Sequence, residues 1–454
     1  MIGWLINVKD DLKISIIVTV YNAEDTIRNT IESILKSCEN ERSELVIVND
    51  GSTDRTKDIL DGYGKLDNVI VIHQENKGVS VARNKGLDSI DKDTDLITFI
   101  DDSDLISENF VKVAKHFFSE HRDIKVAITP IKVMRNEQTY DHVLNYRFQR
   151  SQNFIDIMRD YKCIHFHIGG IVFSSELYES GQLKFNESLS YWEDADMFNS
   201  IILSELKYGL LKDSHYYYDR NNETSLSRKI WSSEKRYTYH IKENYFSLIQ
   251  KSIAIHGRVI PYIQYLIALH YLDYLVEHNQ KYINEMHTNI DRSFEFYSKK
   301  VFKYIDLKII DNLSCLNVYK AYLYSLKGVK FPYFKHYKDI QLVINEYNWR
   351  TQRMVFSFSK NMCGLDYRSC VSVYFGKKKV TTATVKELRD VTLLGHPLED
   401  ICLAKYIAKV PLKCLLFGCR FKVEDIETNT IIWVKNDALV KRLYRRIMKK
   451  GAKK

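Results

Sequence analysis

The chain has 454 residues, of which 45% are hydrophobic, and it carries a formal net charge of +9. This length and composition predict a large core divided between two or three domains. Its eight cysteines are scattered and form no CxxC pair, which excludes a disulfide scaffold and favours a reducing compartment. Because neither a signal peptide nor a membrane-spanning run is recognisable, we expect a cytoplasmic protein.

The N-terminal part alternates apolar runs with helical patterns. Strands are predicted at 14–20, 45–48, 69–72 and 96–100, and helices at 23–35, 54–60 and 79–87. Alternating strands and helices with short loops are typical of a parallel α/β sheet, which binds ligands at the carboxyl ends of its strands. Three polar segments follow strands in this way, at 19–22, 49–52 and 101–104.

The segment Asp101-Asp102-Ser103-Asp104 directly follows the last of these strands. Carboxylates held this close repel one another, and a divalent cation such as Mg²⁺ or Mn²⁺ between them would remove the repulsion. By itself, the segment is equally consistent with a solvated acidic turn at the end of a strand.

A second acidic group, which includes Glu193 and Asp194, precedes an apolar helical pattern. Acids at the start of a helix are also favoured by capping and by the helix dipole. Local pattern alone therefore does not separate a catalytic group from a helix N-terminus.

Together these segments resemble the family 2 glycosyltransferases of the GT-A fold. The matching pieces are 18–22, 48–54, 76–78 with 82–87, the acidic segment, and Trp192-Glu193-Asp194. They occur in the order and spacing of the family, over about residues 12–230. The resemblance implies an α/β Rossmann-like GT-A catalytic domain that uses a nucleotide-sugar donor, usually a UDP-sugar.

The resemblance also implies roles for single residues near the donor. Thr19 and Tyr21 are expected to line the base pocket, Asp50 to accept a hydrogen bond from uracil, and Arg83 to lie near the nucleotide. The alternatives are a turn-and-cap role for Asp50 and a surface helix position for Arg83.

The metal site departs from the family pattern, because Ser103 stands where the second acid is expected. Either Asp102 and Asp104 form the metal-binding pair, or Asp101 and Asp104 act with Ser103 between them. We favour Asp102 and Asp104 at the ion, directly or through one water, with Asp101 at the ribose or diphosphate.

Inverting transfer to a hydroxyl requires a base for the acceptor proton. The resemblance assigns this role to Asp194, with Glu193 as its partner or as the alternative base, and makes Trp192 an apolar platform for a sugar ring. In the family's mobile loop, Arg220 is expected to reach the diphosphate. His215 is interpreted as structural, with a third metal ligand as the alternative.

The C-terminal half resembles no family that the sequence identifies. Residues 231–345 are predicted as a helical domain after the catalytic domain of residues 1–230, and 346–434 as a small β-rich module. Within the module, strands are predicted at 354–359, 371–375, 413–417, 420–423 and 430–434, and a helix near 397–408. Earlier in the chain, residues 163–170 are interpreted as a strand beneath the acceptor site.

Residues 435–454 form a basic tail with nine Lys or Arg and one Asp, a net charge of +8. Its apolar positions recur at helical spacing, which indicates a basic amphipathic helix. Such a helix fits the anionic inner leaflet of a membrane or an anionic polymer, although a partner helix and a solvated end stay open. No aromatic-and-basic groove motif accompanies it, so a nucleic-acid partner is not expected.

The sequence therefore predicts an inverting, metal-dependent hexosyl- or N-acetylhexosaminyltransferase. Its expected acceptor is a cell-surface glycan or a teichoic-acid-like polymer. The alternatives are a transferase with a lipid-linked or small acceptor, and a non-catalytic scaffold that binds nucleotide-sugar or polymer.

Overall fold

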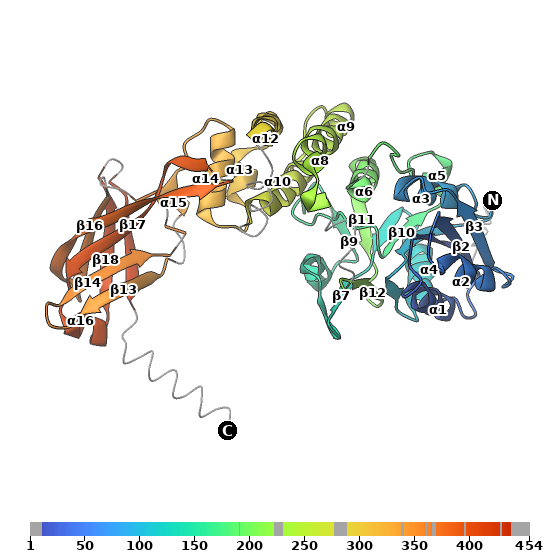
Figure 1. Cartoon of the computed structure of the whole chain (residues 1–454), viewed down its shortest axis with the longest axis horizontal. Coiled ribbons are helices and arrows are strands. Elements are labelled where there is room, and N and C mark those ends of the chain that lie inside the picture. The colour runs from blue at the N-terminus through green and yellow to red at the C-terminus, as the bar shows by residue number, and fades with distance from the viewer. Residues whose placement is uncertain are drawn as a thin grey trace, which may run out of the picture. The chain divides into compact units, whose positions relative to one another are not determined.

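The structure is a computed structural model that describes residues 11–189, 191–221, 230–276, 288–336, 340–359, 361–362, 364–365, 369–394, 396–426 and 429–436. Two compact units are present, Met1–Ile267 and Ala268–Lys454, and each is described by itself (Figure 1). Their boundary falls inside the region predicted as a helical domain. The predicted boundaries after residues 230, 345 and 434 stay predictions.

The first unit is built on an eight-stranded mixed sheet in the order β3-β2-β1-β4-β10-β6-β11-β9. Strands β1 to β4 are mutually parallel, whereas β10 runs antiparallel to β4 and to β6. The strands are β1 (Ile14–Val20), β2 (Ser43–Asp50), β3 (Val69–Gln74), β4 (Leu96–Asp101), β6 (Val126–Ile128), β9 (Phe154–Asp156), β10 (Ile171–Ser174) and β11 (Lys207–Leu210).

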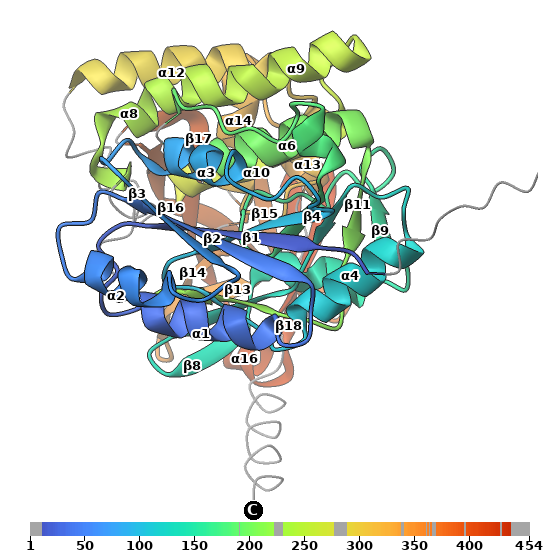
Figure 2. The ribbon, with the colours of Figure 1, turned by 90° about the vertical axis from the view of Figure 1, so that its right-hand side faces the viewer.

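Helices cover both faces of this sheet, so its central strands are apolar on both sides. Helices α1 (Ile27–Ser37) and α2 (Thr56–Tyr63) lie on one face, and α3 (Val79–Leu87) and α6 (Glu193–Glu205) lie on the other (Figures 1 and 2). Helix α3 approaches β1 so closely that a Cβ on Gly86 would lie 2.4 Å from Cγ2 of Ile17. The predicted strands and helices of this region are confirmed.

A second, four-stranded sheet joins the acidic segment to later parts of the chain. Its order is β5-β12-β7-β8, with β5 (Leu105–Ile106), β7 (Ile131–Arg135), β8 (Gln138–Asp141) and β12 (Tyr216–Asp219). The remaining helices of the unit are α4 (Phe110–Glu120), η1 (Val143–Gln149), α5 (Glu176–Glu179), η2 (Ile230–Ser232), α8 (Glu234–Tyr237), η3 (Ile241–Tyr245), α9 (Phe246–His256) and the first part of α10 (Pro261–Leu275).

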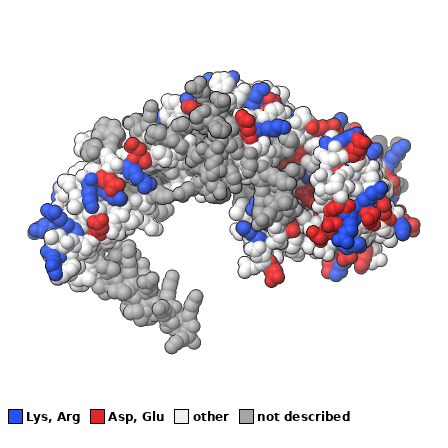
Figure 3. All heavy atoms as spheres, viewed as in Figure 1, with Lys and Arg blue, Asp and Glu red and all other residues white. Residues whose placement is uncertain are grey.

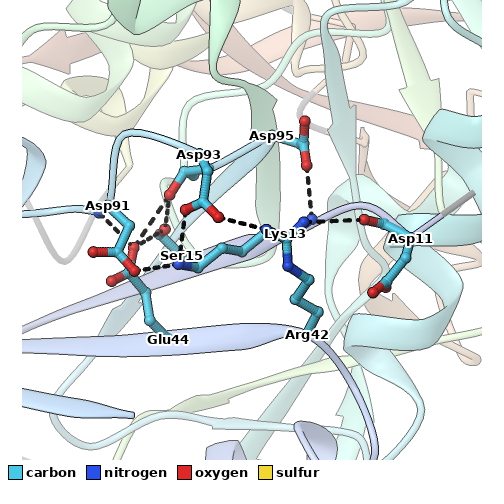
Figure 4. A network of polar contacts seen from close by, with 9 residues as sticks. Asp11, Lys13, Ser15, Arg42, Glu44, Asp91, Asp93 and Asp95 are labelled. Carbon is cyan, nitrogen blue, oxygen red and sulfur yellow. Dashed lines mark hydrogen bonds and ion pairs between the residues drawn. The ribbon is translucent and has the colours of Figure 1, made fainter. Parts of the chain in front are cut away.

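Charges of both signs are mixed over the visible surface of this unit (Figure 3), and one group forms a network at the amino end of β1 (Figure 4). Lys13 Nζ pairs with Asp91 and Asp93, Arg42 pairs with Asp93, and the Lys13 amide donates to Asp95 Oδ2 at 2.8 Å. The acids at this end of the sheet are therefore balanced by two cations. The candidate site lies at the opposite, carboxyl end of the same strands.

The second unit contains helices followed by a seven-stranded antiparallel sheet, β13-β14-β17-β16-β15-β18-β19. The helices are the last part of α10, α12 (Thr288–Phe302), α13 (Leu307–Asp311), α14 (Asn317–Leu326), α15 (Tyr333–His336) and, within the sheet module, α16 (Leu412–Phe417). The strands are β13 (Leu342–Asn348), β14 (Arg353–Phe358), β15 (Ser369–Phe375), β16 (Lys378–Leu393), β17 (His396–Lys409), β18 (Cys419–Asp425) and β19 (Ile431–Asn436). The fold class is therefore as predicted: an α/β domain, then helices, then a β-rich module. Among the described helices, none is both long and apolar enough to cross a membrane.

Two elements predicted in the β-rich module are wrong. Residues 397–408, predicted as a helix, belong to strand β17, where Ala404, Tyr406 and Ala408 alternate into the core at the period of a strand. Residues 413–417, predicted as a strand, form α16, which begins directly after Pro411 and buries Cys414 and Leu415. In both cases packing against neighbouring strands, and not local propensity, determines the conformation.

Candidate functional site

The three polar segments meet at one edge of the main sheet, as predicted. In the strand register Thr19 lies opposite Asp101, and Val20 lies opposite Asn49. The carboxyl ends of β1, β2 and β4 therefore present residues 19–22, 49–52 and 101–104 side by side. This is the place where parallel α/β sheets bind ligands.

Arg83 joins this edge to the start of helix α6. From α3, its Nη2 donates to Asp101 Oδ1 at 3.0 Å and its Nη1 donates to Glu193 Oε1 at 2.9 Å. The guanidinium also lies 5.1 Å from the centre of the Phe185 ring, and the residue is 4% exposed. Burial acts to lower the pKa of Arg83, but the charges of Asp101 and Glu193 raise it above its usual value, so the cation persists. Arg83 is therefore a buried bridge rather than a surface helix residue.

Asp194, next to Glu193, has the properties of a general base. Burial and the charge of Glu193 raise its pKa to about 7, although the charge of Arg83 opposes the shift. Its Oδ1 accepts a hydrogen bond from the Ala195 amide at 2.7 Å, and its side chain is only partly buried. A carboxylate with a pKa near neutrality is matched to proton abstraction at physiological pH.

Asp102 is held mainly through its main chain, and its carboxylate accepts one hydrogen bond from the described residues. Its Oδ2 accepts the Tyr21 amide at 3.0 Å, and its main-chain carbonyl accepts the hydroxyls of Thr26 and Thr30. Burial and the nearby charge of Asp101 raise the pKa of Asp102 to about 7. The backbone is thus fixed, while the carboxylate forms no ion pair within the described residues, unlike the carboxylates of Asp91 and Asp93 at the amino end of β1.

Asp104 was predicted as a metal ligand, but both of its carboxylate oxygens bind groups of the protein, and this prediction is corrected. Its Oδ2 accepts the Tyr216 hydroxyl at 2.6 Å, its Oδ1 accepts the Asp219 amide at 2.8 Å, and the residue is 1% exposed. The carboxylate therefore ties the acidic loop to β12.

Gly169 and Gly170 make this tie possible. A Cβ on Gly169 would lie 2.3 Å from ring carbons of Tyr216, and Gly170 adopts a φ of +75°. Residues 163–170 are consequently an irregular segment that admits the Tyr216 ring, and the predicted strand there is wrong.

We expect Asp104→Ala to lower the free energy of unfolding by about 2–4 kcal/mol, because it leaves the buried Tyr216 hydroxyl without its acceptor. Chemical denaturation measures this loss. The matched control is Asp102→Ala on the same loop, which should cost less stability but weaken cation-dependent donor binding. Equal stabilities with equal loss of binding would contradict the structural role of Asp104.

Both carboxylate oxygens of Asp50 accept hydrogen bonds from the chain. Oδ1 accepts Gln74 Nε2 at 2.8 Å and the Lys77 amide at 2.9 Å, and Oδ2 accepts the Gly78 amide at 2.9 Å. At 4% exposure, Asp50 shapes the loop that leads into α3. The geometry favours the turn-and-cap alternative over a direct bond to uracil.

Trp192 does not offer a platform for a sugar, and this prediction is also corrected. The residue is 4% exposed and adopts a φ of +64° just before α6. Its indole packs edge-on against the rings of His240 and Tyr245, which come from the helices after the 222–229 segment. Trp192 thus anchors the start of the helix that carries Glu193 and Asp194.

The other predicted residues lie around this centre. Tyr21 is 48% exposed, Thr19 is partly buried at the end of β1, and Arg220 is exposed with its guanidinium 5.6 Å from the centre of the Tyr218 ring. The main chain of His215 accepts the Ser107 amide at 3.0 Å and donates to Ser107 Oγ at 3.1 Å, and the structural role of its ring stays a prediction. The loop that follows Arg220 lies outside the described residues.

His167 is a site residue that the sequence reasoning missed. The centre of its ring lies 4.7 Å from that of Tyr218 and 5.9 Å from that of Tyr216. The charges of Asp101, Arg83 and Arg220 also act on its pKa. Burial lowers its pKa, and its Nδ1 accepts the Gly169 amide at 3.0 Å, so the ring is neutral. The His-X-His-X-Gly-Gly pattern was the available signal, but it was interpreted as a strand.

A divalent cation fits Asp101 and Asp102 but not Asp104. The first two are adjacent acids whose mutual repulsion a cation would relieve, whereas both oxygens of the buried Asp104 already accept hydrogen bonds from the chain. Within the described residues, no group of three or more His, Cys, Asp or Glu side chains is arranged to hold a metal ion.

Comparisons with known proteins show what this chain is similar to. Residues 15–180 match the family described as Glycosyl transferase family 2. The minor teichoic acid biosynthesis protein GgaA of Bacillus subtilis is 29% identical over 433 residues, which cover 92% of this chain and 96% of GgaA.

Solved structures share the fold at low identity. The crystal structure of S. aureus TarS superimposes with a TM-score of 0.56 and 13% identity, over 93% of this chain and 77% of TarS. TarS 1–349 in complex with UDP-GlcNAc has a TM-score of 0.54 and 17% identity, over 70% of this chain and 88% of that fragment.

Proposed function

We propose a specific reaction for this chain, which belongs to the family 2 glycosyl transferases through its domain at residues 15–180. In this reaction a sugar passes from a UDP-sugar to a hydroxyl of a teichoic-acid-like polymer, with inversion at the anomeric carbon. The alignment with GgaA over nearly the whole of both chains supports the polymer, and the UDP-GlcNAc complex of the similarly folded TarS supports the donor.

One observation carries the proposal: Arg83 holds the donor-side acid Asp101 and the base-side acid Glu193 on one guanidinium. The bridge sets the start of α6, and hence Asp194, beside the acidic edge of the sheet. Proton removal from an acceptor hydroxyl and departure of the nucleotide then occur at one place, as an in-line displacement requires.

Each residue has a part in this reaction. Asp194 takes the proton of the attacking hydroxyl, and its raised pKa makes it a competent base near pH 7. Arg83 holds Glu193 and Asp101 in position through its two hydrogen bonds. Arg220, exposed on the loop after β12, is available to the diphosphate.

A divalent cation, Mn²⁺ or Mg²⁺, would be held by Asp101 and Asp102 and would neutralise charge on the departing diphosphate. The predicted association of the basic tail with a membrane or polymer concerns residues that, after Asn436, lie outside the described part of the chain, and it stays a prediction.

Calorimetric titration of UDP- and GDP-sugars into the purified chain, with Mn²⁺ or with EDTA, tests the donor site. We expect one UDP-sugar to bind, and to bind at least tenfold more weakly without the cation. Asp102→Asn should remove this cation dependence, because it removes one charge from the proposed ligand pair. Absence of binding by the folded protein across the panel would favour the scaffold alternative.

A further inference from the structure

The sheet module at 340–436 presents a row of cations across four strands. In the register, Lys379 of β16 lies opposite Tyr374 of β15, Tyr374 opposite Arg420 of β18, and Arg420 opposite Lys435 of β19. Directly opposed residues share a face of the sheet. At about 4.8 Å between strands, the row extends over roughly 14 Å. We call Lys379, Tyr374, Arg420 and Lys435, with the neighbouring Trp433, the basic row.

The basic row lies on the outer face of the module. The residues that alternate with it, Val373, Phe421 and Val434, are buried in the core of the module. Lys379 and Lys435 are exposed, and Arg420 is partly exposed.

Such a row costs stability unless it binds something. Like charges directly opposite each other in a sheet are destabilising, and Arg420 faces Lys435. Within the described residues, none of the three cations of the row forms an ion pair. Arg420 Nη2 instead donates to the Gly376 carbonyl at 2.7 Å, which fixes its position without neutralising it.

Two aromatic rings complete the row. Trp433 is 44% exposed, its ring packs edge-on against Tyr374 at 5.1 Å, and the Arg420 guanidinium lies 4.9 Å from its centre. These contacts hold the indole against the sheet rather than letting it project. A fixed aromatic face beside cations suits the C–H surfaces of a sugar or polyol that carries phosphates.

We propose that the basic row binds the acceptor as an extended, phosphate-containing polyol or sugar polymer laid across the strands. Repeating anionic groups match cations repeated from strand to strand, whereas a single phosphate would engage only one of them. A membrane is disfavoured because the aromatic rings of the row are packed onto the sheet and do not form a projecting apolar anchor. This inference rests on the proposed function for the identity of the polymer.

The test measures binding of a synthetic poly(glycerol phosphate) of defined length to the full chain by calorimetry. We expect Lys379→Gln/Arg420→Gln/Lys435→Gln to weaken binding about tenfold and to reduce its dependence on salt. The matched control is Arg353→Gln/Lys386→Gln/Lys409→Gln, which removes the same charge from other positions of the module, on β14, β16 and β17. Arg353 and Lys409 also face each other, on β14 and β17. All variants keep residues 436–454 of the basic tail, so their difference reports the row.

Equal weakening in both triple variants would overturn the proposal, because net charge alone would then explain binding. It would also be overturned if the row variant lost binding to vesicles of phosphatidylglycerol but kept binding to the polymer. Binding requires no donor sugar, so row-dependent binding without any transfer would contradict the proposed reaction and leave this inference standing. If the row variant transferred sugar to the polymer as fast as the wild type, the proposed reaction would stand and this inference would be overturned.

Discussion

Asp194→Asn should reduce sugar transfer by about a thousandfold while leaving the affinity for the UDP-sugar unchanged, because the amide cannot accept the acceptor proton. The wild-type rate should rise with pH through about 7 and then level off, since the base is active only when ionised and burial raises the pKa of Asp194 to about 7. A radiolabelled-donor assay across pH, with calorimetric binding of the donor, gives both quantities.

Glu193→Gln provides the control for this assignment. Glutamine keeps an oxygen that accepts from Arg83 but removes the charge that raises the pKa of Asp194. We therefore expect transfer to persist and its pH profile to move to lower pH. If Glu193→Gln abolished transfer while Asp194→Asn retained it, the roles of the two acids would have to be exchanged.

Local pattern was sufficient for the strands and helices between residues 14 and 100 and for the edge of the sheet at which the acids gather. Strand runs that end in polar residues predict where side chains meet, because the carboxyl ends of parallel strands share one edge. Pattern also placed acids at the start of α6. These features depend on neighbours along the chain or on the handedness and order of α/β units, which sequence reasoning captures.

The errors concern contacts between distant segments. The burial of Trp192 depends on His240 and Tyr245, about fifty residues later, and the Asp104 carboxylate is filled by β12, more than a hundred residues later. An acid that accepts a phenol and an amide in the core has the same sequence signature as one that faces a cation. Strand β17 was missed because its Ala and Leu content suggests a helix, whereas its pairing with β14 and β16 makes it a strand.

Arg83→Met should lower the free energy of unfolding by about 3 kcal/mol at pH 8, because it leaves the carboxylates of Asp101 and Glu193 without their shared cation. The loss should shrink as the pH falls. A buried carboxylate that has no partner cation is neutralised more readily as the solution becomes more acidic. Urea denaturation of both proteins at pH 5 and pH 8 measures the change.

Arg55→Met is the matched control, since the Arg55 guanidinium also pairs with a carboxylate, that of Glu24, but its side chain is 81% exposed. We expect its cost to be close to zero at both pH values, because exposed ion pairs contribute little. The double variant Arg83→Met/Glu193→Gln should recover part of the stability lost in Arg83→Met. A pH-independent loss, or no recovery, would mean that Arg83 acts through its packing on Phe185 and not through the charges that it joins.

Arg83→Lys separates position from charge. One ammonium group keeps the cation but lacks the planar fork that reaches Asp101 and Glu193 together, so stability should be largely retained. Transfer should still fall at least tenfold, because α6 is no longer held at the acidic edge. If Arg83→Lys were fully active, the bridge would be needed for folding alone, and the placement of Asp194 would have to depend on the packing of Trp192.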